Sequence, residues 1–153
     1  NIFMKPTGFT LIEMLIVVTI LVLVAGLVAF SLSNFRATQA LDGGAELVTS
    51  ILIQARQRTL SFAGASVYGV RVTATTLTVF QGAIFPGTNQ EVFTLPDAVT
   101  VSQINLSGGG TDVVFKHLTG ATATDGDLVL SLLADSNQRR IISIRPSGII
   151  EVN

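Results

Sequence analysis

An unbroken apolar run near the N-terminus constrains this chain more than any other feature. From Met14 to Phe30 there is no charged residue, and only Thr19 and Gly26 interrupt the apolar side chains. As an α-helix this run would be roughly 26 Å long, at the short end of the range for a transmembrane helix. A secretory signal peptide would carry a shorter apolar region, of about 7 to 15 residues. The run therefore predicts a transmembrane helix from Met14 to Phe30.

Composition sets further limits. Removing the N-terminal segment from the 153 residues leaves one small domain. Charged residues make up only 12% of the chain, against about 25% in an ordinary soluble protein, and the formal net charge is −1. This charge does not indicate a basic surface for nucleic acid. Because cysteine is absent, disulfide frameworks, zinc–thiolate clusters and thiol catalysis are excluded.

Glu13 is the unusual residue of the apolar segment, because apolar side chains lie on both sides of it. An ionisable side chain inside a membrane segment is costly and often marks a functional site. A second reading is that Glu13 lies near the helix start, at the depth of the lipid headgroups. There its carboxylate would interact favourably with the helix dipole. Composition alone leaves both readings open.

The six residues from Gly8 to Glu13, Gly-Phe-Thr-Leu-Ile-Glu, carry a family resemblance. Followed by a long apolar run, they closely resemble the class III signal sequence of type IV pilins and pseudopilins. The resemblance implies that a prepilin peptidase cuts between Gly8 and Phe9 and methylates the new amino group of Phe9. It also implies that the Glu13 carboxylate acts in assembly, pairing with the Phe9 amine of a neighbouring subunit.

The same resemblance implies partners and a location. The partners would be other pilin or pseudopilin subunits, the prepilin peptidase, an inner-membrane assembly platform, and membrane lipid before assembly. The chain would cross the inner membrane once with its C-terminal domain outside, and would then join an extracytoplasmic filament. Lys5 fits the positive-inside rule, and Met4 is the expected start of a short leader.

Beyond Phe30 the pattern becomes amphipathic. Apolar residues recur at spacings of three and four, which places them on one helix face: Leu41, Ala45, Val48, Leu52 and Ala55. Gly64 is the predicted helix stop. We therefore expect four regions: a leader over 1–8, a transmembrane and filament-core helix over 9–33, the amphipathic half of the same helix over 34–63, and a globular domain over 64–153.

The C-terminal domain reads as short strands rich in Val, Ile, Thr and Phe, separated by turn residues. The predicted strands are Ser66–Thr73, Thr76–Gln81, Glu91–Leu95, Val99–Asn105, Asp112–Leu118, Asp127–Leu133, Arg139–Arg145 and Ile149–Val152. No alternation of strands and helices occurs, so the sheet should be mainly antiparallel. The predicted fold class is α+β and pilin-like, a long helix packed on an antiparallel β-domain.

Two features refine the resemblance. The β-domain, with its closing Ile142–Val152 segment, resembles the GspH and FimT group of minor pseudopilins and pilins. Many major pilins carry a proline inside the hydrophobic helix, and this chain has none between Pro6 and Pro86. This absence favours a minor subunit or pseudopilin.

Other polar residues give weaker signals. His117 could join Asp112 and a serine in a catalytic arrangement, but no nucleophile-elbow spacing occurs. The Asp125-Gly126-Asp127 segment is too short for a calcium loop and indicates a turn. We therefore expect no catalytic residues, no metal site and no cofactor, and the chain is not predicted to be an enzyme.

Two alternatives remain open. A competence-type minor pilin would bind DNA, and Arg139 and Arg140 would be the weak candidates for that contact, although nucleic acid is an unlikely partner overall. The other alternative is a signal-anchored extracytoplasmic β-domain with binding or enzymatic activity.

Overall fold

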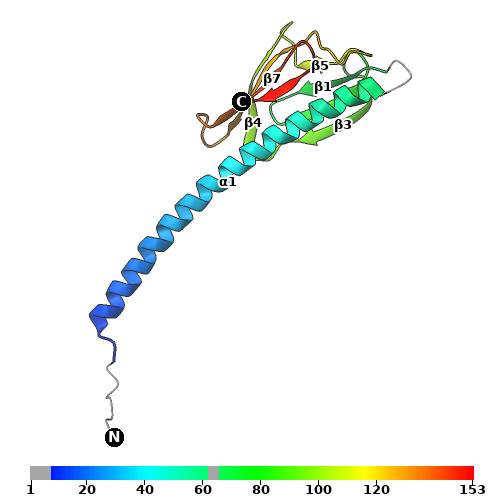
Figure 1. Cartoon of the computed structure of the whole chain (residues 1–153). Coiled ribbons are helices and arrows are strands. Elements are labelled where there is room, and N and C mark those ends of the chain that lie inside the picture. Colours follow the sequence, from blue (N-terminus) through cyan, green and yellow to red (C-terminus); the bar gives the residue numbers. More distant parts are fainter. Residues whose placement is uncertain (1–7, 62–65) are drawn as a thin grey trace. The chain divides into compact units, whose positions relative to one another are not determined.

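The computed structural model describes residues 8–61 and 66–153, which form one helix and eight strands (Figure 1). The helix is α1 (Leu11–Ser61). The strands are β1 (Tyr68–Val72), β2 (Thr76–Gln81), β3 (Thr88–Thr94), β4 (Val99–Leu106), β5 (Asp112–Val114), β6 (Gly126–Leu132), β7 (Arg139–Ile144) and β8 (Ile150–Val152). The chain divides into two compact units, one ending at Arg36 and one running from Ala37 to Asn153.

The helix α1 is 51 residues long and passes from the first unit into the second. No proline lies within it to remove a backbone hydrogen bond. It continues unbroken through Gly43 and Gly44. The predicted stop at Gly64 lies outside the described residues, and the helix as described ends at Ser61.

The strands form two four-stranded sheets. Sheet A has the order β3-β2-β1-β5 and sheet B the order β4-β6-β7-β8. Every pairing between named strands is antiparallel. The predicted antiparallel α+β architecture is therefore confirmed, with the strands divided between two sheets.

Each predicted strand is present, but β5 is much shorter than expected. It ends at Val114 rather than continuing to Leu118. Phe115 makes only an isolated bridge to Thr122, and Leu118 adopts a positive φ of 71°. A residue in this left-handed region cannot continue a strand, so the chain turns before β6.

One hydrophobic core joins α1 to both sheets. The predicted stripe on α1 is buried, with exposed fractions between 0% and 3%: Leu41, Ala45, Val48, Leu52 and Ala55. Facing side chains come from sheet A, such as Val70, and from sheet B, such as Leu130. Burying each large apolar side chain contributes about 1.5 to 3 kcal/mol, so packing on the sheets stabilises this half of the helix.

Polar contacts hold the end of α1 on the β-domain. The buried Thr59 hydroxyl accepts a hydrogen bond from the Tyr68 N–H at 3.0 Å and donates one to the Ala55 carbonyl at 2.9 Å. Arg58 forms a two-point salt bridge with Glu91 of β3, at 2.6 and 3.0 Å. The hydrogen bond from Arg58 lowers the pKa of the Glu91 carboxyl and raises the pKa of the guanidinium.

Candidate functional site

The Gly8–Glu13 segment forms the start of α1. Thr10 precedes the first helical residue, and its hydroxyl accepts a hydrogen bond from the Glu13 N–H at 3.3 Å. In return the Thr10 N–H donates to the Glu13 carboxylate at 3.5 Å. This reciprocal arrangement is a capping box, which satisfies backbone N–H groups that have no partner inside the helix.

The capping box places the Glu13 carboxylate in the first turn of α1. The helix dipole favours a negative charge at this position. Whether Glu13 lies at headgroup depth or inside the membrane stays open. Thr10 is a residue that the sequence interpretation passed over. A Thr followed by Glu three residues later, just before an apolar run, is a recognisable capping signal.

Gly8 and Phe9 lie just before this cap and are accessible. Phe9 is 73% exposed, and no atom lies within 4 Å of the position that a side chain on Gly8 would take. The predicted cleavage bond therefore lies in an exposed segment next to a defined helix start. The predicted leader residues Met4 and Lys5 lie outside the described residues.

The apolar part of α1 is long enough to cross a membrane. Leu11–Ala29 has a mean hydropathy of 2.9, and none of it is buried inside the protein; within the described residues it is the one such span. The hydroxyl of Thr19, within this span, donates to the Leu15 carbonyl at 2.7 Å. That bond satisfies the polar group without water, as a lipid environment requires.

The two arginines considered for DNA binding lie at the start of β7. Arg139 is exposed, whereas Arg140 forms a salt bridge with Asp42 of α1 at 2.7 Å. The fold thus pairs Arg140 with an acidic residue of the helix. DNA binding by Arg139 and Arg140 stays an untested prediction.

Two of the remaining polar candidates, Asp112 and Asp127, form hydrogen bonds with other side chains of the β-domain. Both carboxylate oxygens of Asp112 accept hydrogen bonds from Arg71, at 2.6 and 2.8 Å. Asp127 accepts a hydrogen bond from Ser143 at 2.7 Å. Across the described ranges 8–61 and 66–153, no group of three or more acidic or histidine side chains could hold a metal ion.

Comparison with known families gives a match at the N-terminus. Residues 4–29 match the family described as the prokaryotic N-terminal methylation motif. This range contains the capping box and the whole apolar span Leu11–Ala29. A search of curated protein sequences finds no significant match.

Comparison with solved structures gives a match for the fold. Two crystal forms of the type IV minor pilin FimU from Pseudomonas aeruginosa are similar to this chain. One has a TM-score of 0.54 and 15% sequence identity, covering 74% of this chain and 92% of FimU. The other has a TM-score of 0.58 and 16% identity, covering 78% of this chain and 92% of FimU. The fold is therefore pilin-like, in agreement with the predicted GspH and FimT group.

The protein of similar fold, FimU, is described as a type IV minor pilin. One apolar helix and the methylation motif indicate a membrane-anchored, single-pass protein with a C-terminal domain. The chain thus carries the prokaryotic N-terminal methylation motif and has a fold similar to that of a type IV minor pilin.

Proposed function

We propose that this chain is a minor subunit of a type IV pilus, cut after Gly8 by a prepilin peptidase and methylated on the amino group of Phe9. The observation that carries the proposal is the Thr10–Glu13 capping box directly after the Gly8–Phe9 bond, inside the matched motif. The likeness to the minor pilin FimU supports a minor rather than a major subunit.

The proposed role of Glu13 follows from charge burial. Cleavage would create an ammonium group on Phe9, and assembly would bring the apolar helices together in a core without water. An unpaired charge is costly in such a place, whereas a paired carboxylate and ammonium cost much less. Glu13 of an arriving subunit would therefore pair with Phe9 of its neighbour and set the register between helices.

The expected location of the protein and the expected regions of its chain fit the same proposed sequence of processing and assembly. Before assembly the 9–33 helix would lie in the inner membrane among lipids, with 64–153 outside as the exposed domain. The assembly platform would then extract the processed subunit into the extracytoplasmic filament. The amphipathic region 34–63 would connect the filament core to the β-domain. A type II secretion pseudopilus would use the same parts, and no observation favours it over a pilus.

Mass spectrometry of the N-terminus tests the processing step. Protein purified from cells with the peptidase should begin at N-methyl-phenylalanine 9, and protein from cells without it should keep its leader. Gly8→Val should block cleavage without disturbing the fold, because the space around Gly8 is open. An intact leader on the unmodified chain in peptidase-positive cells would contradict the proposal.

Substitution at the cap tests the assembly role. Glu13→Gln keeps an oxygen that can accept the Thr10 hydrogen bond but removes the charge. We expect this variant to be inserted and processed normally, yet absent from sheared filaments. Thr10→Ala is the matched control, since it weakens the cap and keeps the charge. Normal assembly of Glu13→Gln would show that the carboxylate has no pairing role.

A further inference from the structure

The last strand of sheet B, β8, leaves one side of its backbone open. Asn153 exchanges two hydrogen bonds of 2.9 Å with Ile141 of β7, and the Arg145 N–H donates to Ile149 at 2.8 Å. Because antiparallel pairing alternates between bonded and non-bonded residues, the peptide groups of Ile150 and Val152 point away from β7. In the part of the chain that the structure describes, no strand pairs with this side.

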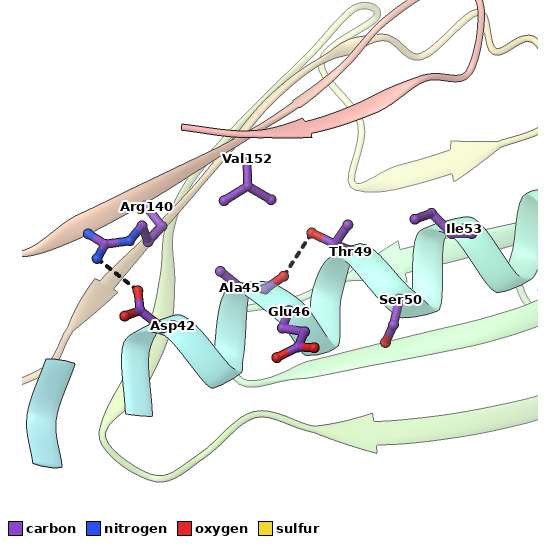
Figure 2. Close-up of a pocket in the computed structure, with 8 residues that line it drawn as sticks. All are labelled: Asp42, Ala45, Glu46, Thr49, Ser50, Ile53, Arg140 and Val152. Atoms are coloured by element: carbon purple, nitrogen blue, oxygen red, sulfur yellow. Dashed lines mark hydrogen bonds and ion pairs between the residues drawn. The ribbon is translucent and has the colours of Figure 1, made fainter. Parts of the chain in front are cut away.

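An apolar groove lies beside this open edge (Figure 2). We call it the edge groove, and define it by the residues that line it: Asp42, Ala45, Glu46, Thr49, Ser50 and Ile53 of α1, Arg140 of β7 and Val152 of β8. Its volume is about 440 Å³. Ile53 is 40% exposed and Val152 is 46% exposed. The groove is thus a surface of aliphatic groups that the protein's own fold leaves partly uncovered.

The strand edge and the helix run side by side. A side chain on Gly148 would touch Arg56, whereas Val152 lies with Ala45 at the groove. The two positions on α1 are roughly 16 Å apart along the helix, while Gly148 lies in the turn before β8 and Val152 lies at the end of β8. The open edge of β8 therefore follows α1 in the opposite direction. Another strand, placed at the usual spacing of about 4.8 Å from β8, would cover the groove.

Charged residues lie at one end of the groove. Asp42 and Arg140 form their salt bridge there, and the exposed Glu46 lies one turn further along α1 (Figure 2). Among the described residues Glu46 makes no salt bridge. A basic side chain on an incoming segment would be favoured at this end, and apolar side chains would be favoured along the rest.

We propose that the edge groove binds an extended segment of a neighbouring pilin-like subunit, which pairs with β8 as a fifth strand of sheet B. The inference rests on the proposed function, because it requires assembly into a filament. Strand addition combines backbone hydrogen bonds with pockets for alternate side chains. The segment would place apolar side chains on α1 at every second position and a basic residue next to Glu46.

A peptide segment suits this site better than a small molecule. Small-molecule pockets enclose most of the ligand and supply a few convergent polar groups, whereas the edge groove is open along one side. Its unpaired backbone groups are matched by another extended backbone. With only two outward-facing residues, the pairing would be weak alone and would act together with the helix contacts of the filament.

Photo-crosslinking in filament-producing cells tests the inference. A photoreactive benzoylphenylalanine would replace Ile53 in the full chain, with the same substitution at Ile84 as control. Ile84 is 81% exposed on the connection between β2 and β3, away from sheet B. In sheared filaments we expect an adduct from position 53 to an extended segment of a subunit with its own methylation motif, and none to that segment from position 84.

Three further variants address the pairing and the groove. Val152→Pro removes an outward N–H that makes no bond to β7, and proline is tolerated at strand edges. It should reduce the adduct by about tenfold, the effect of losing roughly one hydrogen bond. Val152→Ile keeps the N–H and should retain the adduct. Thr49→Lys fills the groove without altering β8 and should also suppress the adduct, which guards against misfolding of the proline variant.

The outcomes separate the two proposals. If Val152→Pro and Thr49→Lys both gave as much adduct as the chain without these changes, the strand-addition inference would be overturned. An adduct formed only with helical residues, lipid or a small molecule would also overturn it. Filaments that contain the chain but give no adduct also overturn it. If the chain is never processed at Phe9 and never enters filaments, the proposed function fails and this inference fails with it.

Discussion

Thr59 shows how one side chain secures the junction between α1 and the β-domain. Its hydroxyl is fully buried and joins the Tyr68 N–H to the helix carbonyl of Ala55. We expect Thr59→Val to destabilise the protein by about 1 to 3 kcal/mol, because the buried Tyr68 N–H loses its acceptor. Urea unfolding of the detergent-solubilised chain measures the change.

Thr59→Ser is the matched control for this prediction, since it keeps the hydroxyl and removes only a methyl group. The free energy of unfolding of Thr59→Ser should be much closer to that of the parent than the value for Thr59→Val. If the two variants were equally destabilised, the effect would come from the methyl group and its packing, and the hydrogen bond would be of little consequence.

At the residue scale, local signals were predictable and distant partners were not. The Gly8–Glu13 motif and the Thr10 cap are contained in a few consecutive residues. The pairing of Arg140 with Asp42 depends on how β7 meets α1, and no local pattern encodes that. Arg140 therefore looked like a candidate for DNA contact in the sequence, whereas the fold gives it an acidic partner.

At the scale of the helix, the two adjacent glycines of α1 differ in their surroundings. A side chain on Gly43 would meet nothing within 4 Å, whereas one on Gly44 would lie 3.2 Å from Val99 of β4. We expect Gly43→Ala to stabilise the protein by about 1 kcal/mol through helix propensity. Gly44→Ala should gain less or lose stability, because Val99 must shift.

Thermal unfolding of the two variants side by side measures this difference. Each serves as the control for the other, since the chemical change is the same at neighbouring positions of one helix. Equal stabilisation by both would mean that the contact between Gly44 and Val99 is easily relaxed, and that close packing does not explain that glycine.

The Arg58–Glu91 salt bridge links α1 to β3 and predicts a pH dependence. The folded-state pKa of Glu91 lies below its ordinary value of 4.5. The salt bridge therefore stabilises the fold at pH values above the pKa of Glu91 in the unfolded state. This stabilisation is lost as the pH falls through the lower pKa of Glu91 in the folded state. Because both side chains are partly exposed, we expect Glu91→Gln to cost less than about 1 kcal/mol at pH 7.

The measurement compares the unfolding midpoint of Glu91→Gln with that of the parent at pH 7 and again well below pH 4.5. The difference should shrink at the lower pH and at high salt, which screens exposed charges. Glu46→Gln is the control, because Glu46 lacks a salt bridge among the described residues. A difference that persisted in acid would point to packing rather than charge.

The strands themselves were predictable, but their arrangement was not. Runs rich in Val, Ile, Thr and Phe, separated by turn residues, located every strand, because these signals depend on neighbouring residues. The pairing of β1 with β5 and the division into two sheets depend on contacts between distant segments. The open edge of β8 and the edge groove beside it follow from that division, so neither was apparent in the sequence.

At the scale of the whole molecule, the second half of α1 belongs to the folded domain. Its four largest core side chains, Leu41, Val48, Ile51 and Leu52, are at most 3% exposed. Their burial contributes about 6 to 12 kcal/mol, which is comparable to the total stability of a small protein, about 5 to 15 kcal/mol. The predicted domain 64–153 therefore lacks a part that its core requires.

The large contribution of α1 to the core predicts how two truncated proteins will behave. A chain of residues 37–153 should be monomeric and should unfold in one cooperative transition, because the described core lies within it. A chain of residues 66–153 should show no cooperative transition by circular dichroism or calorimetry, since sheets A and B would expose the surface that α1 covers. A cooperative transition of 66–153 near the temperature of 37–153 would instead make the helix dispensable. In that case α1 would be an anchor attached to an independent β-domain, and the edge groove, which needs Ala45 and Ile53, could not be treated as part of a rigid binding surface.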